Sequence, residues 1–271
     1  MGGYVEAGGT TIWAESRGRG PDVLLIAGLS DPAEAWQAQL DALSDRYRVI
    51  AFDNRGAGRT PLPDGPMSVA SMADDAAELL RVLGVGRAHV AGFSGGSAIA
   101  QELALRHPQA VRSLVLMSTW ARADAYFTAM TRSWHRLATE ASDERAMLES
   151  FLLWVYTPRA HADGTVRWIV DETLAFPYPQ SAEAFQRQLD SFMEHDTLDR
   201  LPGVTAPTLV LAGELDIATP PRLGRVVAEA IPGARFEVLA GEAHQPFQES
   251  PDVFNARVDA FWRHAGGAAP A

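Results

Sequence analysis

Short, mainly apolar runs that alternate with helical segments constrain the fold of this chain more than any other feature. The runs occupy residues 23–27, 49–52, 88–91, 114–117, 208–212 and 236–239. A strand that is apolar on both faces is typical of a parallel sheet covered by helices on both sides. The runs therefore predict a sheet that is buried on both faces.

The segments between these runs carry the apolar spacing of helices. They cover residues 34–43, 69–83, 95–107, 221–231 and 251–262. An alternating segment at residues 4–16 turns at Gly8-Gly9, which predicts a hairpin. Strands and helices in alternation favour an α/β fold with one open, mostly parallel sheet and helices on both faces.

Residues 120–198 interrupt this alternation, because they hold no strand-like run and read as several helices rich in aromatic residues. We expect an α/β core from residues 1–119 and 199–265, a helical cap from 120–198, and a flexible tail at 266–271. Many of the aromatic side chains would form the cap's own core. A cap that covers the carboxyl edge of the sheet would also wall a ligand pocket.

Composition excludes several classes of function. The 271 residues carry a formal net charge of −11, which disfavours nucleic acid and anionic membranes as partners. No apolar run is long enough to span a bilayer, and no signal peptide is apparent, so we expect a cytoplasmic protein. The absence of cysteine and lysine excludes a thiol nucleophile, thiolate metal sites and a lysine Schiff base. No metal or organic cofactor is implied, and the expected partner is a small-molecule substrate of a monomer or homodimer.

The strongest local motif is Gly-Phe-Ser-Gly-Gly at residues 92–96, which follows an expected strand and precedes an expected helix. This context is typical of a nucleophile elbow, a tight turn that lifts the serine hydroxyl clear of the sheet. Ser94 is therefore the candidate nucleophile. A purely structural glycine-rich turn is the alternative, and Ser97 is expected to be a structural hydroxyl in the first turn of the helix.

A serine nucleophile needs a base and an orienting acid. His244 follows the run at 236–239, and Asp216 follows the run at 208–212, so both lie at the carboxyl edge that also carries Ser94. Glu214 is the rival acid. The order Ser94, Asp216, His244 is that of α/β-hydrolase triads. The other histidines are less well placed, within a strand, at a helix end, in the insert or in the tail: His89, His107, His135, His161, His195 and His264.

The remaining candidate residues would bind the substrate or the oxyanion that forms from it. The backbone N–H groups of Leu29 and Gly95 are the expected oxyanion donors. Ser30 either binds substrate or caps the helix that begins near Pro32. Candidate substrate-binding residues are Ser30, Phe93, Trp120 and Trp154.

Two further segments complete a resemblance to the α/β-hydrolase superfamily. Residues 53–60 resemble its D-x-R-G-x-G-x-S segment, which we interpret as structural, and His244, Glu249 and Pro251 resemble its H-x4-E-x-P close. The chain looks most similar to 3-oxoadipate enol-lactonase-like proteins and to methyl-esterases of bacterial polyketide pathways. Many relatives have His at Ala27 and Met or a larger residue at Gly95. The second difference would widen the pocket or loosen the elbow.

The expected function is a serine hydrolase that cleaves an ester, lactone or thioester of an apolar small molecule, in the setting of bacterial secondary metabolism that the resemblance implies. The same triad also serves carbon–carbon bond hydrolases and cofactor-free peroxidases. A non-hydrolytic binding protein or a polyketide cyclase that uses the same pocket is the further alternative.

Overall fold

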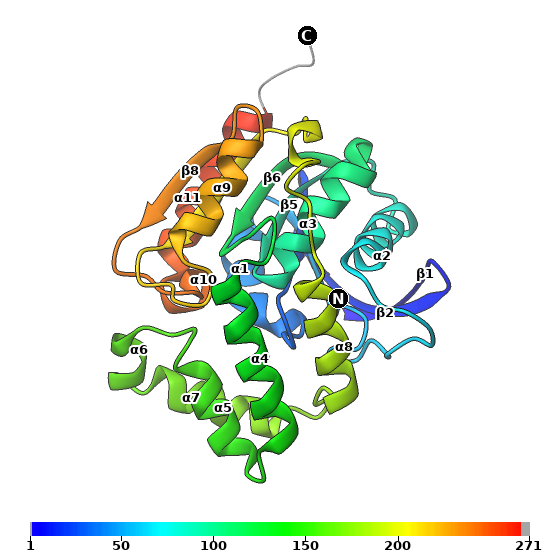
Figure 1. Ribbon diagram of the computed structural model, residues 1–271. Helices are drawn as coiled ribbons and strands as arrows, with labels where there is room; N and C mark the ends of the chain where they lie inside the picture. The colour runs from blue at the N-terminus through cyan, green and yellow to red at the C-terminus, as the bar shows by residue number, and fades with distance from the viewer. Residues whose placement is uncertain (1, 267–271) are drawn as a thin grey trace.

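An eight-stranded sheet forms the centre of the molecule in the computed structural model, which describes residues 2–266 (Figure 1). Its strand order is β1-β2-β4-β3-β5-β6-β7-β8. The hairpin β1–β2 and the β2–β4 pair are antiparallel, and every later pair is parallel. The predicted mostly parallel sheet is thereby confirmed. Its strands are β1 Gly2–Ala7, β2 Thr10–Arg17, β3 Asp22–Ile26, β4 Arg48–Phe52, β5 Ala88–Phe93, β6 Val111–Met117, β7 Thr208–Gly213 and β8 Arg235–Leu239.

Along the central strands β3 to β7 the side chains alternate between two separate cores, which explains why these runs are apolar throughout. Leu24 and Ile26 of β3 face the core under α2 (Val69–Val82), α3 (Gly95–Arg106) and α9 (Pro221–Ala230). Val23 and Leu25 of the same strand face the core under α1 (Gln37–Leu43) and α11 (Pro251–Gly266).

Short elements fill the connections: the 3-10 turns Ala33–Trp36, Pro108–Ala110 and Leu201–Gly203, and helix α10, Pro246–Glu249. Helix α11 continues to Gly266, so the first residue of the predicted tail is helical instead. The rest of that tail, residues 267–271, lies outside the described residues. No helix within residues 2–266 is both long and apolar enough to cross a membrane.

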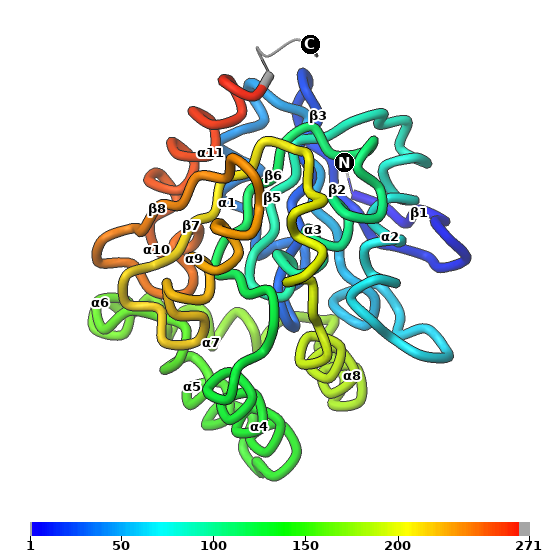
Figure 2. The backbone as a smooth tube through the Cα atoms, turned by 45° about the horizontal axis from the view of Figure 1, so that its top comes forward, coloured from blue at the N-terminus to red at the C-terminus, as the bar shows by residue number. Residues whose placement is uncertain are grey.

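Five helices lie between β6 and β7 and gather at one end of the molecule (Figures 1 and 2). Most begin at a Ser, Thr or Asp whose side chain accepts a backbone N–H of the first turn, as the N-cap preference predicts. Their apolar faces join the core beneath α2 and α3. The helices are α4 Ala125–Glu140, α5 Glu144–Leu152, α6 Pro158–Ala162, α7 Thr165–Ala175 and α8 Ala182–Met193.

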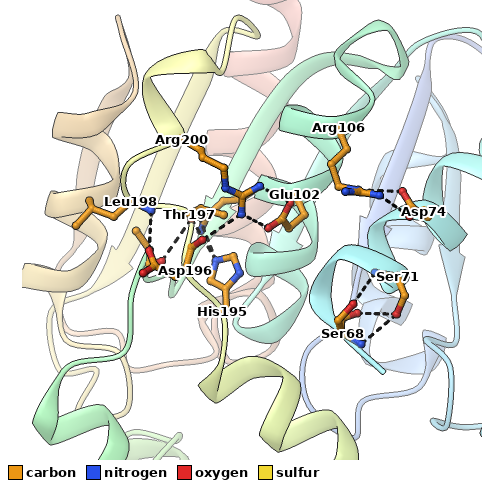
Figure 3. Close-up of polar contacts among 12 residues, drawn as sticks. Ser68, Ser71, Asp74, Glu102, Arg106, His195, Asp196, Thr197, Leu198 and Arg200 are labelled. Atoms are coloured by element: carbon orange, nitrogen blue, oxygen red, sulfur yellow. Dashed lines mark hydrogen bonds and ion pairs between the residues drawn. The ribbon is translucent and has the colours of Figure 1, made fainter. Parts of the chain in front are cut away.

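The two chain segments that connect these helices to the sheet are held together. Arg122 and Asp196 form a β-bridge, and the Arg122 guanidinium pairs with the Asp196 carboxylate at 2.6 Å. Figure 3 shows Arg200, just beyond, reaching the Glu102 carboxylate on α3, at 3.0 Å for one nitrogen–oxygen pair. Helix α3 begins directly after the serine of the 92–96 motif, so this contact ties the end of the helical insert to the helix that follows that serine.

Candidate active site

Ser94 occupies a strained turn between β5 and α3. Its φ of 50° and ψ of −120° lie in a region that residues other than glycine rarely adopt. The turn is possible because its neighbours have no side chain. A Cβ on Gly92 would lie 2.3 Å from the Gly96 carbonyl oxygen, and one on Gly96 would lie 2.1 Å from that of Ile26. The Ser94 N–H donates to the Met117 carbonyl at 2.9 Å, which ties the turn to β6.

His244 lies between the serine and an acid. Its Nε2 is 3.0 Å from Ser94 Oγ, and its Nδ1 is 2.8 Å from Asp216 Oδ2. The histidine backbone is held from two sides, because its carbonyl accepts from Ser118 Oγ and its N–H donates to the Val155 carbonyl of the helical insert. The structure thus places Ser94 next to His244 and His244 next to Asp216, in the order expected for nucleophile, base and acid.

Asp216 is buried and its carboxylate is fully used. Oδ1 accepts the N–H groups of Ala218 at 2.9 Å and Thr219 at 2.8 Å, and Oδ2 accepts the Thr219 hydroxyl at 2.8 Å besides the histidine. These donors fix the carboxylate plane and so the orientation of the imidazole. The rival acid, Glu214, is exposed and accepts the Gly241 N–H instead.

The two expected oxyanion donors lie at the same end of the sheet. Leu29 follows β3, and Gly95 is the first residue of α3, where N–H groups have no helical partner. Among residues 2–266 neither N–H donates to another protein group. Asn54 supports the first of these loops through its amide, which donates to the Ala27 carbonyl at 3.0 Å.

Asp53 of the D-x-R-G segment stabilises the chain that follows β3 through hydrogen bonds, which is the structural role expected of this segment. Asp53 accepts the N–H groups of Ala33 at 2.6 Å and Arg59 at 2.7 Å. A Cβ on Gly58 would lie 2.3 Å from the Asp53 carboxylate, so glycine is required for this close approach.

Ser30 does not cap the helical turn after Pro32, so that alternative is wrong, and its hydroxyl contacts the helical insert. The helical turn after Pro32 has no side-chain cap, and the Ser30 hydroxyl donates to the Gln180 side chain of the helical insert. The Ser30 N–H donates to Gln188 Oε1 at 3.2 Å, and the residue has a left-handed φ of 66°. Gln188 is fully buried and also donates to the Arg55 carbonyl. The insert therefore holds the loop that carries Leu29.

The three aromatic candidates are mainly packed into cores. Phe93 is 2% exposed, and its ring packs against the His244 ring at a distance of 4.9 Å between the ring centres. Trp120 is also 2% exposed and packs against the Phe192 ring, although its indole N–H has no partner among the described residues. Trp154 is partly buried against the core that the insert shares with α2 and α3.

The glycine at position 95 does not widen the site, because Phe192 of α8 fills the space of the missing side chain. A Cβ on Gly95 would lie 2.3 Å from Phe192 Cζ. Phe192 is itself 2% exposed and has no room to withdraw.

We expect Gly95→Met to destabilise the fold by about 1–3 kcal/mol, the usual range for overpacking a core. Phe192→Ala alone should also destabilise it, by roughly 3–5 kcal/mol. The double variant should be more stable than the sum of the two losses predicts, because the methionine occupies the space that the ring vacates. Equilibrium urea unfolding measures all three free energies.

Gly86→Met is the matched control, since a Cβ there meets nothing within 4 Å. This variant should not couple to Phe192→Ala. Additive losses for Gly95→Met and Phe192→Ala would contradict the packing explanation.

Sequence reasoning missed two polar residues at this site. Thr219 fixes the Asp216 carboxylate, and a hydroxyl three residues after the acid was the available signal. Asp31 follows the expected oxyanion loop, and burial raises the pKa of its carboxyl group to about 7 although the nearby His244 opposes the shift.

Burial also lowers the pKa of His89 and of His195 to about 4, so both are neutral structural histidines at pH 7. Within residues 2–266 no group of three or more His, Asp or Glu residues is arranged to hold a metal ion.

A mostly parallel sheet with a strained serine turn, a histidine and a buried acid at its carboxyl edge defines the α/β-hydrolase architecture. Residues 21–145 match the family model described as the alpha/beta hydrolase fold. The chain is also 34% identical over 258 residues to the provisionally named carbamate hydrolase RutD of Azorhizobium caulinodans, covering 95% of this chain and 97% of that protein. The chain therefore belongs to the α/β-hydrolase family of enzymes.

Two solved structures are similar over nearly the whole chain. The enol-lactonase of Burkholderia xenovorans LB400 is 26% identical with a TM-score of 0.86, and the match covers 96% of this chain and all of that one (100%). A thermophilic esterase of Thermogutta terrifontis is 25% identical with a TM-score of 0.85, covering 98% and 99% of the two chains. The expected likeness to enol-lactonases is confirmed.

Proposed function

We propose that this enzyme is a serine hydrolase that cleaves a carboxylic ester, lactone or thioester of an apolar small molecule. One observation carries the proposal: the continuous hydrogen-bonded series from Ser94 Oγ through His244 to Asp216, with distances of 3.0 and 2.8 Å. Relatives named as an enol-lactonase and an esterase support the choice of bond.

The reaction follows from the role of each group. His244 Nε2 takes the Ser94 proton as the serine oxygen attacks the carbonyl carbon, and Asp216 stabilises the imidazolium that results. The N–H groups of Leu29 and Gly95 bind the oxyanion. His244 then protonates the leaving group, and water, activated by the same histidine, releases the acid from Ser94.

We assign the helices of residues 120–198 to a cap over this site. The cap contacts the catalytic loops directly, through Val155 to His244 and through Gln180 and Gln188 to Ser30. Its aromatic side chains favour an apolar substrate.

A fluorophosphonate probe tests the proposal without knowledge of the substrate, because it reacts only with an activated serine. Mass spectrometry of the wild type should show one probe per chain, located at Ser94, and Ser94→Ala should show none. A folded wild-type sample that takes up no probe would rule out a serine hydrolase.

A further inference from the structure

Asp31 is a partly buried acidic residue that has no role in the proposed mechanism. It follows the loop that carries Leu29, and a Cβ on Gly28 would lie 3.1 Å from its Oδ2 and 3.1 Å from Phe93 Cε1. The Phe93 ring in turn contacts the His244 ring. Asp31 and the catalytic histidine therefore both lie close to the Phe93 ring.

No structural role accounts for this carboxyl group. The helical turn that begins after Pro32 has no side-chain cap, and its Ala33 N–H donates to Asp53. Within residues 2–266 Asp31 forms no ion pair, and both nitrogens of His244 are already occupied by Ser94 and Asp216. Its protein partner is the backbone N–H of Gly28, which leaves most of its acceptor sites free.

The residue is also open to a ligand. Asp31 keeps part of its surface accessible, as do Leu29 and Ser94, whereas Gly28, Phe93 and His244 around it are buried. Its Oδ2 lies close to Gly28 and to the Phe93 ring, and that ring packs against His244, so the accessible surface belongs to the loop beside the catalytic residues. Because this carboxyl group has acceptor sites that the protein does not fill, a ligand that donates to it binds more tightly than one that cannot.

We infer that Asp31 is a specificity-determining residue, whose carboxyl group accepts a hydrogen bond from an O–H or N–H group of the substrate close to the reacting carbonyl. The inference rests on the proposed serine-hydrolase function. A carboxyl group accepts such a bond in either protonation state, because the protonated form keeps its carbonyl oxygen as an acceptor. The titratable groups that face it are His244 and Tyr156, from the loop after β8 and from the helical insert.

Two matched pairs of esters test this inference, one for each side of the scissile bond. On the acyl side, 4-nitrophenyl glycolate differs from 4-nitrophenyl propanoate by a hydroxyl in place of a methyl group. On the leaving-group side, 2-hydroxyethyl acetate differs from propyl acetate in the same way. The ratio to measure is the kcat/KM of the hydroxyl ester over that of the methyl ester, divided by the ratio of their rate constants for alkaline hydrolysis without enzyme. In the wild type this ratio should be about tenfold or more in one pair, the value for a hydrogen bond to a charged group.

Asp31→Asn keeps an acceptor oxygen without the charge, and Asp31→Leu removes the acceptor. The ratio should fall in the order Asp, Asn, Leu and reach about 1 for Leu. Asp45→Leu is the matched control, because Asp45 is an exposed carboxylate that pairs with Arg46 after α1, and its ratio should equal that of the wild type.

A wild-type ratio of 1 or less in both pairs would overturn the inference, even if the Asp31 variants did not fold. An equal loss for both members of a pair in Asp31→Leu would overturn it as well, since that result indicates a structural role. Probe labelling of Ser94 separates these outcomes from a failure of the proposed function. A wild type that is neither labelled nor active on any ester removes both proposals.

Discussion

Ser94→Ala is expected to lower kcat for ester hydrolysis by a factor on the order of 10⁶, the loss typical when a triad nucleophile is removed. The alanine retains the fold, because the strained turn is set by Gly92 and Gly96 and by the Ser94 N–H bond to Met117 rather than by the hydroxyl. Burst-phase and steady-state kinetics with 4-nitrophenyl propanoate measure the effect. A variant that retains more than about a hundredth of wild-type kcat would contradict an acyl-enzyme on Ser94.

Ser97→Ala is the matched control for this prediction. The Ser97 hydroxyl donates to the Ser94 carbonyl at 2.6 Å, its oxygen lies 2.8 Å from Thr119 Oγ1, and the residue is buried. Its loss should reduce stability by about 1 kcal/mol, the net value of a hydrogen bond. Its kcat should remain within about tenfold of the wild type, since no bond to the reacting atoms is lost.

Asp216→Asn is expected to lower kcat by about 10⁴-fold while the fold is retained. The backbone N–H groups of Ala218 and Thr219 both donate to Oδ1, so they fix the asparagine carbonyl oxygen at that position. The amide NH2 must then face His244 Nδ1. That contact forces the imidazole into the tautomer with its proton on Nε2, which cannot accept the Ser94 proton.

Glu214→Gln is the matched control for the acid, because Glu214 was the alternative assignment by sequence. Its carboxylate accepts the Gly241 N–H at 2.8 Å and takes no part in the histidine contact. Steady-state kinetics should show a loss of less than about tenfold for Glu214→Gln. If Glu214→Gln were the slower of the two variants, the orienting acid would be assigned wrongly.

Much of the core could be predicted from the sequence because its signals are local. The six apolar runs became β3 to β8. The strands β3 to β7 are buried on both faces and therefore need apolar side chains on both, whereas the edge strand β8 is partly exposed. The serine turn was predictable for a related reason. Only glycine at positions 92 and 96 permits the close approach of helix and strand, so the turn can be recognised from these two glycines in the sequence.

The substrate-binding residues were harder to predict, because their roles depend on contacts between segments far apart in the sequence. The sequence predicts that Ser30 binds substrate or caps a helix, and in the structure Gln180 and Gln188 of the helical insert contact it. The sequence also predicts that Gly95 widens the pocket or loosens the elbow, and in the structure Phe192 fills the space beside it. Nothing local to residues 30 or 95 could have indicated a partner that lies over 90 positions away.

The sequence by itself determined the order of strands and helices, the serine turn and the carboxyl edge to which Asp216 and His244 belong. These features follow from side-chain periodicity and backbone conformation, which act over a few residues. The tertiary structure alone decided which side chains meet: that the insert holds the Leu29 loop, that Phe192 fills the space beside Gly95, and that Asp31 lies close to Gly28 and the Phe93 ring. Burial and hydrogen-bond satisfaction are properties of the packed chain, and they arise only when distant segments are brought together.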